Sequence, residues 1–360
     1  MSSTTQLVLP TSQATVSVKA FNIGVGPTVP AAMFIGPNIP GFETMRAPVY
    51  AFLIEHRATG KRFMFDLGAR KDPENYPPVM RTRIQNAGLN IHVEKDAADQ
   101  LTEGGVDLKT IDGVIWSHTH FDHTGDPSTF PSSTQLYIGP GSDRRTYPGD
   151  PEAILLDTDF VGRTVNEFSF TESNLDIGGL LAIDFFKDGS LYILDVPGHC
   201  PGHIAALARV KPNSFVLLAG DSFHHPGMIR PNEHIHANYP CPAELLESTR
   251  KSISTKYFPL PIHTDGSGDF DLGARDTPLL TVPEGPSAYA DREVSIKSQK
   301  ILGHLFDVHP NVFIVIAHDF SLEETIQLFP ESLDDWKEKG WKEKSIWEFL
   351  KDKRFKGTKE

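Results

Sequence analysis

The sequence contains only two cysteines, Cys200 and Cys241, among its 360 residues. Two thiols are too few for the disulfide framework of a small secreted domain, so we expect both to be reduced and structural. The chain also lacks a basic N-terminal segment followed by an apolar stretch, and no segment reaches the roughly 20 apolar residues of a membrane span. These absences predict a cytoplasmic protein that has no membrane partner.

Positive charge is also scarce. The chain has 34 Lys and Arg against 47 Asp and Glu, which gives a formal net charge of -13. A nucleic-acid phosphodiesterase needs a basic surface to neutralise phosphates, so this balance argues against nucleic acid as a partner. With 39% hydrophobic residues, the chain can bury a sizeable core. The composition therefore favours a globular enzyme that acts on a small molecule.

Histidine, in contrast, is concentrated at one place. The apolar run 111–116 is followed directly by the sequence SHTHFDH. Alternate residues leave an extended segment on the same side, so His118 and His120 can face one metal ion, and the next turn can bring Asp122 and His123 to a second. A cluster of structural histidines is the alternative, because an isolated histidine usually has no ligand role.

Three further segments have the same design, an apolar run that ends in a residue able to bind a metal. They are 190–198 before His199, 214–220 before Asp221, and 312–317 before His318. Strand ends are where a rigid sheet positions reactive groups on loops. Four such segments in one chain predict a hydrolytic site with two metal ions.

The order of these motifs resembles that of a known family. His118-x-His120-x-Asp122-His123 is followed by Pro-Gly-His199-Cys-Pro-Gly-His203, then by Gly220-Asp221 and Ala317-His318-Asp319. This pattern resembles the metallo-β-lactamase superfamily and, within it, the N-acyl homoserine lactonase branch, over about residues 49–319. The resemblance implies an α/β fold, the four-layer αβ/βα sandwich, with the metals at one edge between the sheets.

The resemblance also implies which residues bind the metals. His118, His120 and His199 would hold one ion, Asp122, His123 and His318 would hold the other, and Asp221 would bridge them. Asp66 would accept a hydrogen bond from a ligand histidine, although a simple turn residue before Gly68 is the alternative. Cys200 could also be taken for a ligand, but the resemblance gives that role to His199.

The expected cofactor is therefore a pair of divalent metal ions. Imidazole and carboxylate ligands without a thiolate suit zinc, which is the default expectation, and they also admit iron, manganese or cobalt. Such a pair lowers the pKa of a bridging water toward ~7, and the resulting hydroxide attacks a carbonyl.

This chemistry predicts a metal-dependent hydrolase that opens a small cyclic ester, cyclic amide or cyclic carbamate. A lactone is the first choice, and a lactam or cyclic carbamate, as in the benzoxazolinone-opening relatives, is second. A glyoxalase-II-like thioester hydrolase and a single-iron sulfur dioxygenase share these ligands and are the alternatives. Asp122 or His224 would protonate the leaving atom.

His224 marks a departure from the lactonases of this branch, which typically carry a tyrosine three residues after the bridging Asp. This chain has Asp221-Ser-Phe-His224 instead. An imidazole can donate a proton near neutral pH, so His224 suits a leaving nitrogen as well as a leaving oxygen. A structural role for His224 is equally compatible with the sequence.

A single domain is expected over residues 1–360, with three added segments. The Gly- and Pro-rich loop 24–48 is a candidate lid, and the others are an insert at 222–276 and a C-terminal helical tail at 331–360. Substrate-binding residues are predicted at Met33, Phe34, Ile35 and Phe223. The loop could instead cover a sheet edge or form a contact in a homodimer.

The periodicity of the remaining sequence predicts alternating strands and helices. Strands are expected over 16–23 and 49–56, and helices over 76–86, 97–104 and 294–306.

Overall fold

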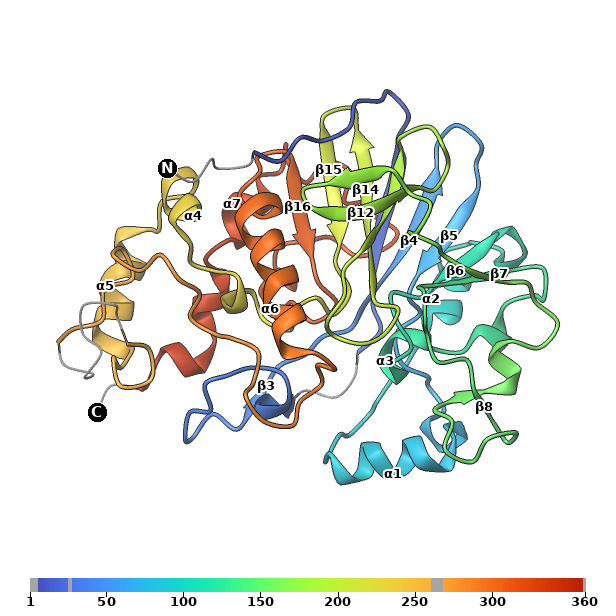
Figure 1. The fold of residues 1–360 in the computed structure, drawn as a ribbon, viewed down its shortest axis with the longest axis horizontal. Helices are drawn as coiled ribbons and strands as arrows, with labels where there is room; N and C mark the ends of the chain where they lie inside the picture. Colours follow the sequence, from blue (N-terminus) through green and yellow to red (C-terminus); the bar gives the residue numbers. More distant parts are fainter. Residues whose placement is uncertain (1–5, 25–27, 260–267, 359–360) are drawn as a thin grey trace.

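Two six-stranded sheets form the centre of the computed structural model, which describes residues 6–24, 28–259 and 268–358. Parts of the predicted lid loop, residues 25–27, and of the predicted insert, residues 260–267, lie outside the described residues. The predicted strand and helix positions agree with the structure to within a few residues. Figure 1 shows the sheets face to face with helices outside them, so the predicted αβ/βα sandwich is confirmed.

The first sheet has the strand order β1-β4-β5-β6-β7-β10. Strands β1, β4 and β5 are antiparallel, and β5, β6, β7 and β10 run parallel. Their bounds are β1 Val16–Asn22, β4 Tyr50–His56, β5 Arg62–Phe65, β6 Gly113–Ile115, β7 Gln135–Ile138 and β10 Val165–Glu167.

The second sheet follows the chain order from β11 to β16. Neighbouring strands are antiparallel up to β15, and the last strand, β16, is parallel to β15. The bounds are β11 Leu175–Ile177, β12 Leu180–Asp184, β13 Leu191–Asp195, β14 Ile204–Lys211, β15 Ser214–Leu218 and β16 Val312–Val315.

The sheets are held together by side chains that alternate along each strand. Val16 and Val18 of β1 pack with Ile193 of β13 and Val216 of β15 in one buried cluster between the sheets. The intervening residues of the strands point outward, because successive side chains leave a strand on opposite faces. Both faces of each sheet are therefore apolar, which explains the continuous apolar runs in the sequence.

Helices cover the outer faces. Leu101 of α2 packs with Phe21 of β1 outside the first sheet, and Phe306 packs with Leu217 of β15 outside the second. The helices are α1 Pro78–Asn86, α2 Ala97–Glu103, α3 Phe121–Thr124, α4 Glu233–Asn238, α5 Ala243–Ser252, α6 Arg292–Ile301 and α7 Trp341–Ser345. A π-helical turn, Leu302–Phe306, continues α6, so the helix predicted over 294–306 changes its winding after Ile301.

The segment 28–48 forms a small two-stranded ribbon. Its strands are β2 Val29–Pro30 and β3 Thr44–Met45, and the 3-10 turn Ala31–Met33 follows β2. A second small ribbon pairs β8, Thr146–Tyr147, with β9, Leu155–Leu156. None of the described helices has the length and apolar character needed to cross a membrane.

The tail at 331–360 differs from the single amphipathic helix that the sequence suggests. It contains the short helix α7 and two 3-10 turns, Glu348–Lys351 and Lys353–Phe355. Trp336 packs in the cluster between the sheets, whereas Phe349 packs in the cluster outside the second sheet. One straight helix cannot direct its apolar side chains to two separate cores, so the chain turns repeatedly.

This tail also reaches the insert. His225 is fully buried beside the rings of Phe349 and Phe355, and its Nε2 lies 3.4 Å from Asp352 Oδ2. A buried ion pair makes another long-range connection, because Arg230 donates through Nε and Nη2 to the two carboxylate oxygens of Asp307, both at 2.8 Å. The insert is therefore fixed to both the tail and the end of the π-helical turn.

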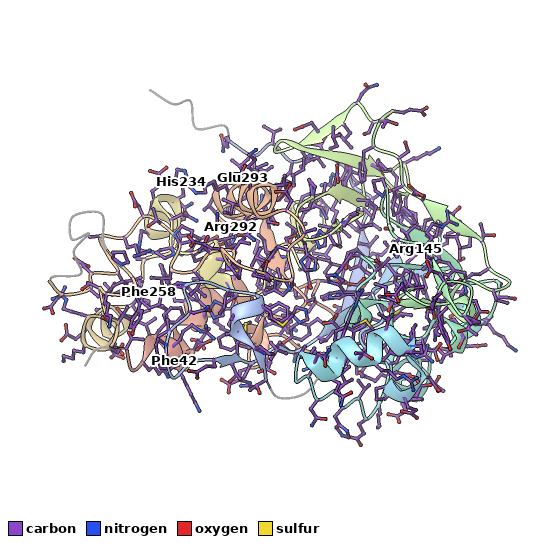
Figure 2. All side chains as sticks on the ribbon, turned by 60° about the horizontal axis from the view of Figure 1, so that its bottom comes forward. Phe42, Arg145, His234, Phe258, Arg292 and Glu293 are labelled. Carbon is purple, nitrogen blue, oxygen red and sulfur yellow. The ribbon has the colours of Figure 1, made fainter. Side chains whose placement is uncertain are left out.

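We expect Asp307→Ala to lower the free energy of unfolding by about 3–5 kcal/mol, because it leaves the Arg230 guanidinium buried without its counter-charge. Denaturant unfolding followed by circular dichroism would measure the loss. Asp143→Ala is the matched control, since Asp143 pairs with the exposed Arg145 near the opposite end of the molecule from Phe258 (Figure 2). An equal loss for both variants would contradict the importance of the buried pair.

Candidate metal centre

The predicted ligands come together at the ends of four strands. The loop after β6 carries His118 and His120, and the short helix α3 that follows it carries Asp122 and His123. The loops after β13, β15 and β16 carry His199, Asp221 and His318. Helix α3 begins immediately after His120 and turns the chain, so that His123 returns toward the cluster. The rigid sheets thus bring together residues that are up to 200 positions apart in sequence, from His118 to His318.

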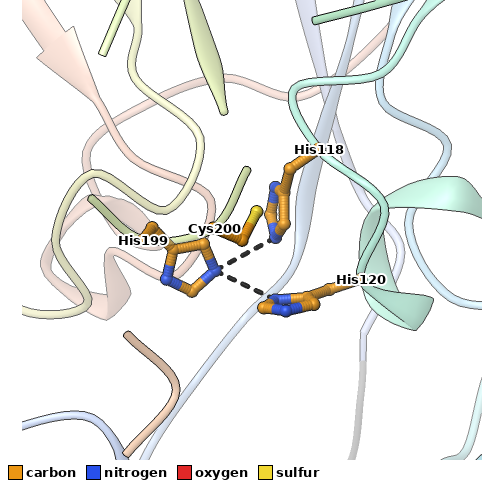
Figure 3. A group of neighbouring side chains, drawn as sticks. All are labelled: His118, His120, His199 and Cys200. Atoms are coloured by element: carbon orange, nitrogen blue, oxygen red, sulfur yellow. Dashed lines mark hydrogen bonds between the residues drawn. The ribbon is translucent and has the colours of Figure 1, made fainter. Parts of the chain in front are cut away.

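The first group consists of three imidazoles. His199 Nε2 lies 3.2 Å from His118 Nε2 and 2.9 Å from His120 Nδ1, as the dashed lines in Figure 3 show. The Cys200 thiol also lies within 4.8 Å of these nitrogens. Burial raises the pKa of Cys200, which favours the neutral thiol over the thiolate.

The second group is arranged around one carboxylate. Asp221 Oδ1 lies 3.2 Å from both His123 Nε2 and His318 Nε2. Its other oxygen, Oδ2, lies 3.4 Å from His199 Nε2, so Asp221 faces both groups. Asp122 Oδ2 lies 3.7 Å from His318 Nε2. All seven residues predicted as ligands are therefore in one cluster.

Several buried polar atoms in this cluster have no hydrogen-bond partner among the described residues. They include His123 Nε2 and Asp221 Oδ1. Buried polar atoms in proteins are normally paired, so an unpaired nitrogen and oxygen that face each other need an explanation. A pair of cations held by imidazole and carboxylate would satisfy these atoms, and the residues fit such a group.

Surrounding residues orient the ligand side chains. Asp66 Oδ2 lies 2.8 Å from His123 Nδ1, and Asp66 also accepts hydrogen bonds from the backbone N–H and the hydroxyl of Ser117. Asp66 adopts φ 61°, a left-handed conformation that is uncommon for a residue other than glycine. His318 Nδ1 donates to the Pro48 carbonyl at 2.8 Å, which leaves Nε2 to face Asp221.

His203 has a role that the sequence did not reveal. Its Nδ1 donates to the Val196 carbonyl, and its Nε2 accepts the backbone N–H of Asp221 at 3.0 Å. Burial lowers the pKa of His203 to about 4, so the ring is neutral and can accept this bond. The second Pro-Gly-His unit, which ends in His203, was the sequence signal that could have identified this residue.

The pKa values of His118 and His123 are shifted in opposite directions, because burial dominates at His118 and is outweighed by neighbouring carboxylates at His123. Burial lowers the pKa of His118 well below its ordinary value. Burial alone would also lower the pKa of His123, but the carboxylates of Asp221 and Asp66 raise it well above its ordinary value.

His224 is fully enclosed at the edge of this cluster. Its Nε2 lies 3.1 Å from Asp221 Oδ2, and its Nδ1 lies 2.6 Å from the hydroxyl of Tyr289. The His224 ring stacks on the ring of His318 with centroids 5.4 Å apart, and Phe34 lies at 4.7 Å. Burial lowers the pKa of His224, which favours the neutral imidazole.

A cavity of about 710 Å³ opens onto the cluster. Met33 and Phe34 line it, as predicted for substrate-binding residues, together with His224 and Tyr289. Ile35 and Phe223 do not line it. The turn after β2 directs Ile35 into the core, where it is 1% exposed, and Phe223 is 2% exposed in the same apolar cluster.

The cavity also contains residues that the sequence did not single out. Tyr289 comes from a loop without periodicity, and five more lining residues come from α1 and its C-terminal cap: Met80, Arg83, Ile84, Asn86 and Ala87. For Tyr289, no sequence signal indicated a position near His224.

Comparison with known proteins gives consistent results. The model of the family described as the metallo-beta-lactamase superfamily matches residues 45–261. The chain is 39% identical over 357 residues to gamma-lactamase FDB1 of Fusarium pseudograminearum (strain CS3096), covering 96% of this chain and 84% of that protein. It is 38% identical over 355 residues to metallo-hydrolase mfmC of Annulohypoxylon moriforme, covering 96% and 89%.

The fold also resembles that of solved structures. A crystal structure of a quorum-quenching N-acyl homoserine lactone lactonase superposes with a TM-score of 0.53 at 16% identity, covering 90% of this chain and 100% of that one. This likeness concerns the fold alone.

We expect Asp66→Ala to weaken metal binding by about 10–100-fold, because loss of an outer hydrogen bond frees the ligand ring that it orients. Metal content after dialysis against graded chelator would measure the effect. Asp112→Ala is the control, since the exposed Asp112 only accepts the backbone N–H of Arg62. Unchanged metal retention in Asp66→Ala would leave Asp66 with a purely local role in the turn.

Proposed function

The chain belongs to the metallo-beta-lactamase superfamily, and on this premise we propose that it is a metal-dependent hydrolase that opens a small cyclic amide or carbamate. The observation that carries the choice of substrate class is the buried imidazole of His224, which lies 3.1 Å from Asp221 on the cavity wall. The similarity to a gamma-lactamase over most of both chains supports the same class. A cyclic ester is the second candidate.

In this proposal, the centre would hold two divalent ions. His118, His120 and His199 would hold one, Asp122, His123 and His318 would hold the other, and Asp221 would contribute to both. The ligand types suit zinc. When bound, such ions polarise a carbonyl and provide hydroxide near neutral pH.

The residues around the centre control where protons are held. Burial raises the pKa of Tyr289 well above its ordinary value, so the phenol keeps its proton. The phenol donates a hydrogen bond to His224 Nδ1 at 2.6 Å, so the single N–H of the neutral imidazole lies on Nε2. His224 therefore presents a donor toward Asp221 and the cavity.

That donor matches the needs of an amide. A ring nitrogen leaves poorly as an anion, whereas it leaves readily as an amine once it has received a proton. His224 Nε2 would donate a hydrogen bond to the leaving nitrogen, and Asp122, which also lines the cavity, would carry the proton released by the attacking water to that nitrogen. The apolar walls, including Met33 and Phe34, limit the access of bulk water.

The metal assignment leads to a first prediction. Purified protein should contain about two metal ions per chain, and Asp221→Ala should lose metal and activity together, because one carboxylate serves both sites. Elemental analysis combined with a hydrolysis assay would measure both quantities. Full activity of Asp221→Ala with unchanged metal content would refute the shared role.

The substrate class leads to a second prediction. In a panel of γ-lactams, cyclic carbamates, lactones and thioesters, we expect turnover of the cyclic amides or carbamates. His224→Ala should lower kcat and kcat/KM by similar factors, about 10²–10⁴ for a lost donor to the leaving atom, and should impair lactams more than lactones.

The control for this experiment is His236→Ala, because His236 belongs to the same insert but stacks on Trp347 outside the cavity. Equal rates for His224→Ala and the parent on both substrate classes, with two metals still bound, would assign His224 to packing. Turnover of thioesters alone would overturn the proposed substrate class.

A further inference from the structure

Helix α1 forms one wall of the cavity mainly with one face. Met80, Arg83, Ile84 and Ala87 line the cavity, and their spacing of three, four and seven residues places them on one side of a helix. Asn86 adds a polar side chain at the border of this face. In Figure 1, α1 lies at the lower edge of the molecule, away from the centre of both sheets. The sheets therefore do not cover this face.

The apolar residues of this face have no core of their own. Met80 is only 9% exposed, yet neither Met80 nor Ile84 belongs to any of the three apolar clusters of the described residues. Across the cavity they face an apolar wall that includes Phe34 and Met45. An apolar helix face that packs on no core is suited to an apolar ligand.

The cavity is also larger than the reacting ring requires. Its volume of about 710 Å³ is in the range of pockets that enclose drug-sized ligands, roughly 300–1,000 Å³. A lactam or cyclic carbamate ring alone would occupy only the part next to Asp221 and His224. The lining residues reach from Asp221 and His224 to α1, so the volume next to α1 suits a substituent on the ring.

Arg83 is a charged residue on the cavity wall that suits a polar group at the end of this substituent. Arg83 is the one lysine or arginine among the lining residues; its side chain is exposed and forms no hydrogen bond or ion pair among the described residues. The neighbouring Arg81 instead donates to the Glu74 carbonyl. In a chain with a formal net charge of -13, an arginine without an acidic partner at an apolar cavity is suited to an anionic ligand.

We propose that the substrate is a cyclic amide or carbamate with an apolar arm that lies along α1 and ends in a carboxylate bound by Arg83. This inference rests on the proposed ring-opening function and adds the chemistry of the substituent. The metal centre would act on the ring, and Arg83 would hold the far end of the arm. The contact is the same in the ground state and the transition state, so Arg83 determines KM and leaves kcat largely unaffected.

The test uses three synthetic probes with the metal-loaded enzyme. They are a γ-lactam with a hexanoate arm, the same lactam with a methyl hexanoate arm, and the same lactam with an aminohexyl arm. We expect the enzyme to prefer the carboxylate probe by about tenfold in kcat/KM, through KM, since an exposed charge pair is of modest strength. Arg83→Met should abolish this preference, and Arg83→Glu should reverse it in favour of an aminohexyl arm.

Arg81→Met is the matched control, because Arg81 lies on the same helix but does not line the cavity. It should keep the preference for the carboxylate probe. A preference that is absent from the parent, or that persists in Arg83→Met, would overturn the role of Arg83.

A binding measurement separates this inference from the proposed function. The ring-opened form of the hexanoate probe should bind the parent more tightly than Arg83→Met by about tenfold in calorimetry, whether or not the enzyme turns over the lactam. Failure of all lactams and carbamates to react, together with this difference in binding, would sink the proposed reaction but support the anion site. Equal binding by the two proteins would overturn the anion site itself.

Discussion

One buried carboxylate determines how the rest of this protein is built. Asp221 is 2% exposed and lies within 3.7 Å of five imidazoles, those of His118, His123, His199, His224 and His318. Burial alone would raise the pKa of Asp221, but the surrounding histidines lower it well below its ordinary value. A charge in this position is tolerable only if several loops meet around it, and the two sheets provide the fixed strand ends that bring them there.

The position three residues after Asp221 is where this chain departs from the pattern of the lactonases that its sequence resembles. A tyrosine is typical there in the lactonases that the sequence resembles, whereas this chain has His224. A tyrosine hydroxyl is still present near the site, because Tyr289 reaches His224 from a distant loop. The phenol thus acts on the cavity through an imidazole instead of directly, which changes the donor that a leaving atom would meet.

Much of the fold and site could be predicted from sequence because the signals were local. Each ligand follows an apolar run, so the pattern of residues around His199 or Asp221 was sufficient to place it at a strand end. The prediction failed where neighbouring residues face different ways. Phe34 lines the cavity while Ile35 enters the core, and no periodic pattern in the turn distinguishes them. The position of Tyr289 depends on tertiary packing. Tyr289 lies in a loop, and the residues next to it in the sequence form no periodic pattern that would have indicated its place beside His224.

The C-terminal tail extends the influence of the site well beyond the cavity. His225, which contacts Phe349, Phe355 and Asp352, is the chain neighbour of His224, so the tail packs directly on the segment that carries the cavity wall. Substitutions at residues 349–355 can therefore reach the position of His224 through this packing, at a distance from the reacting atoms.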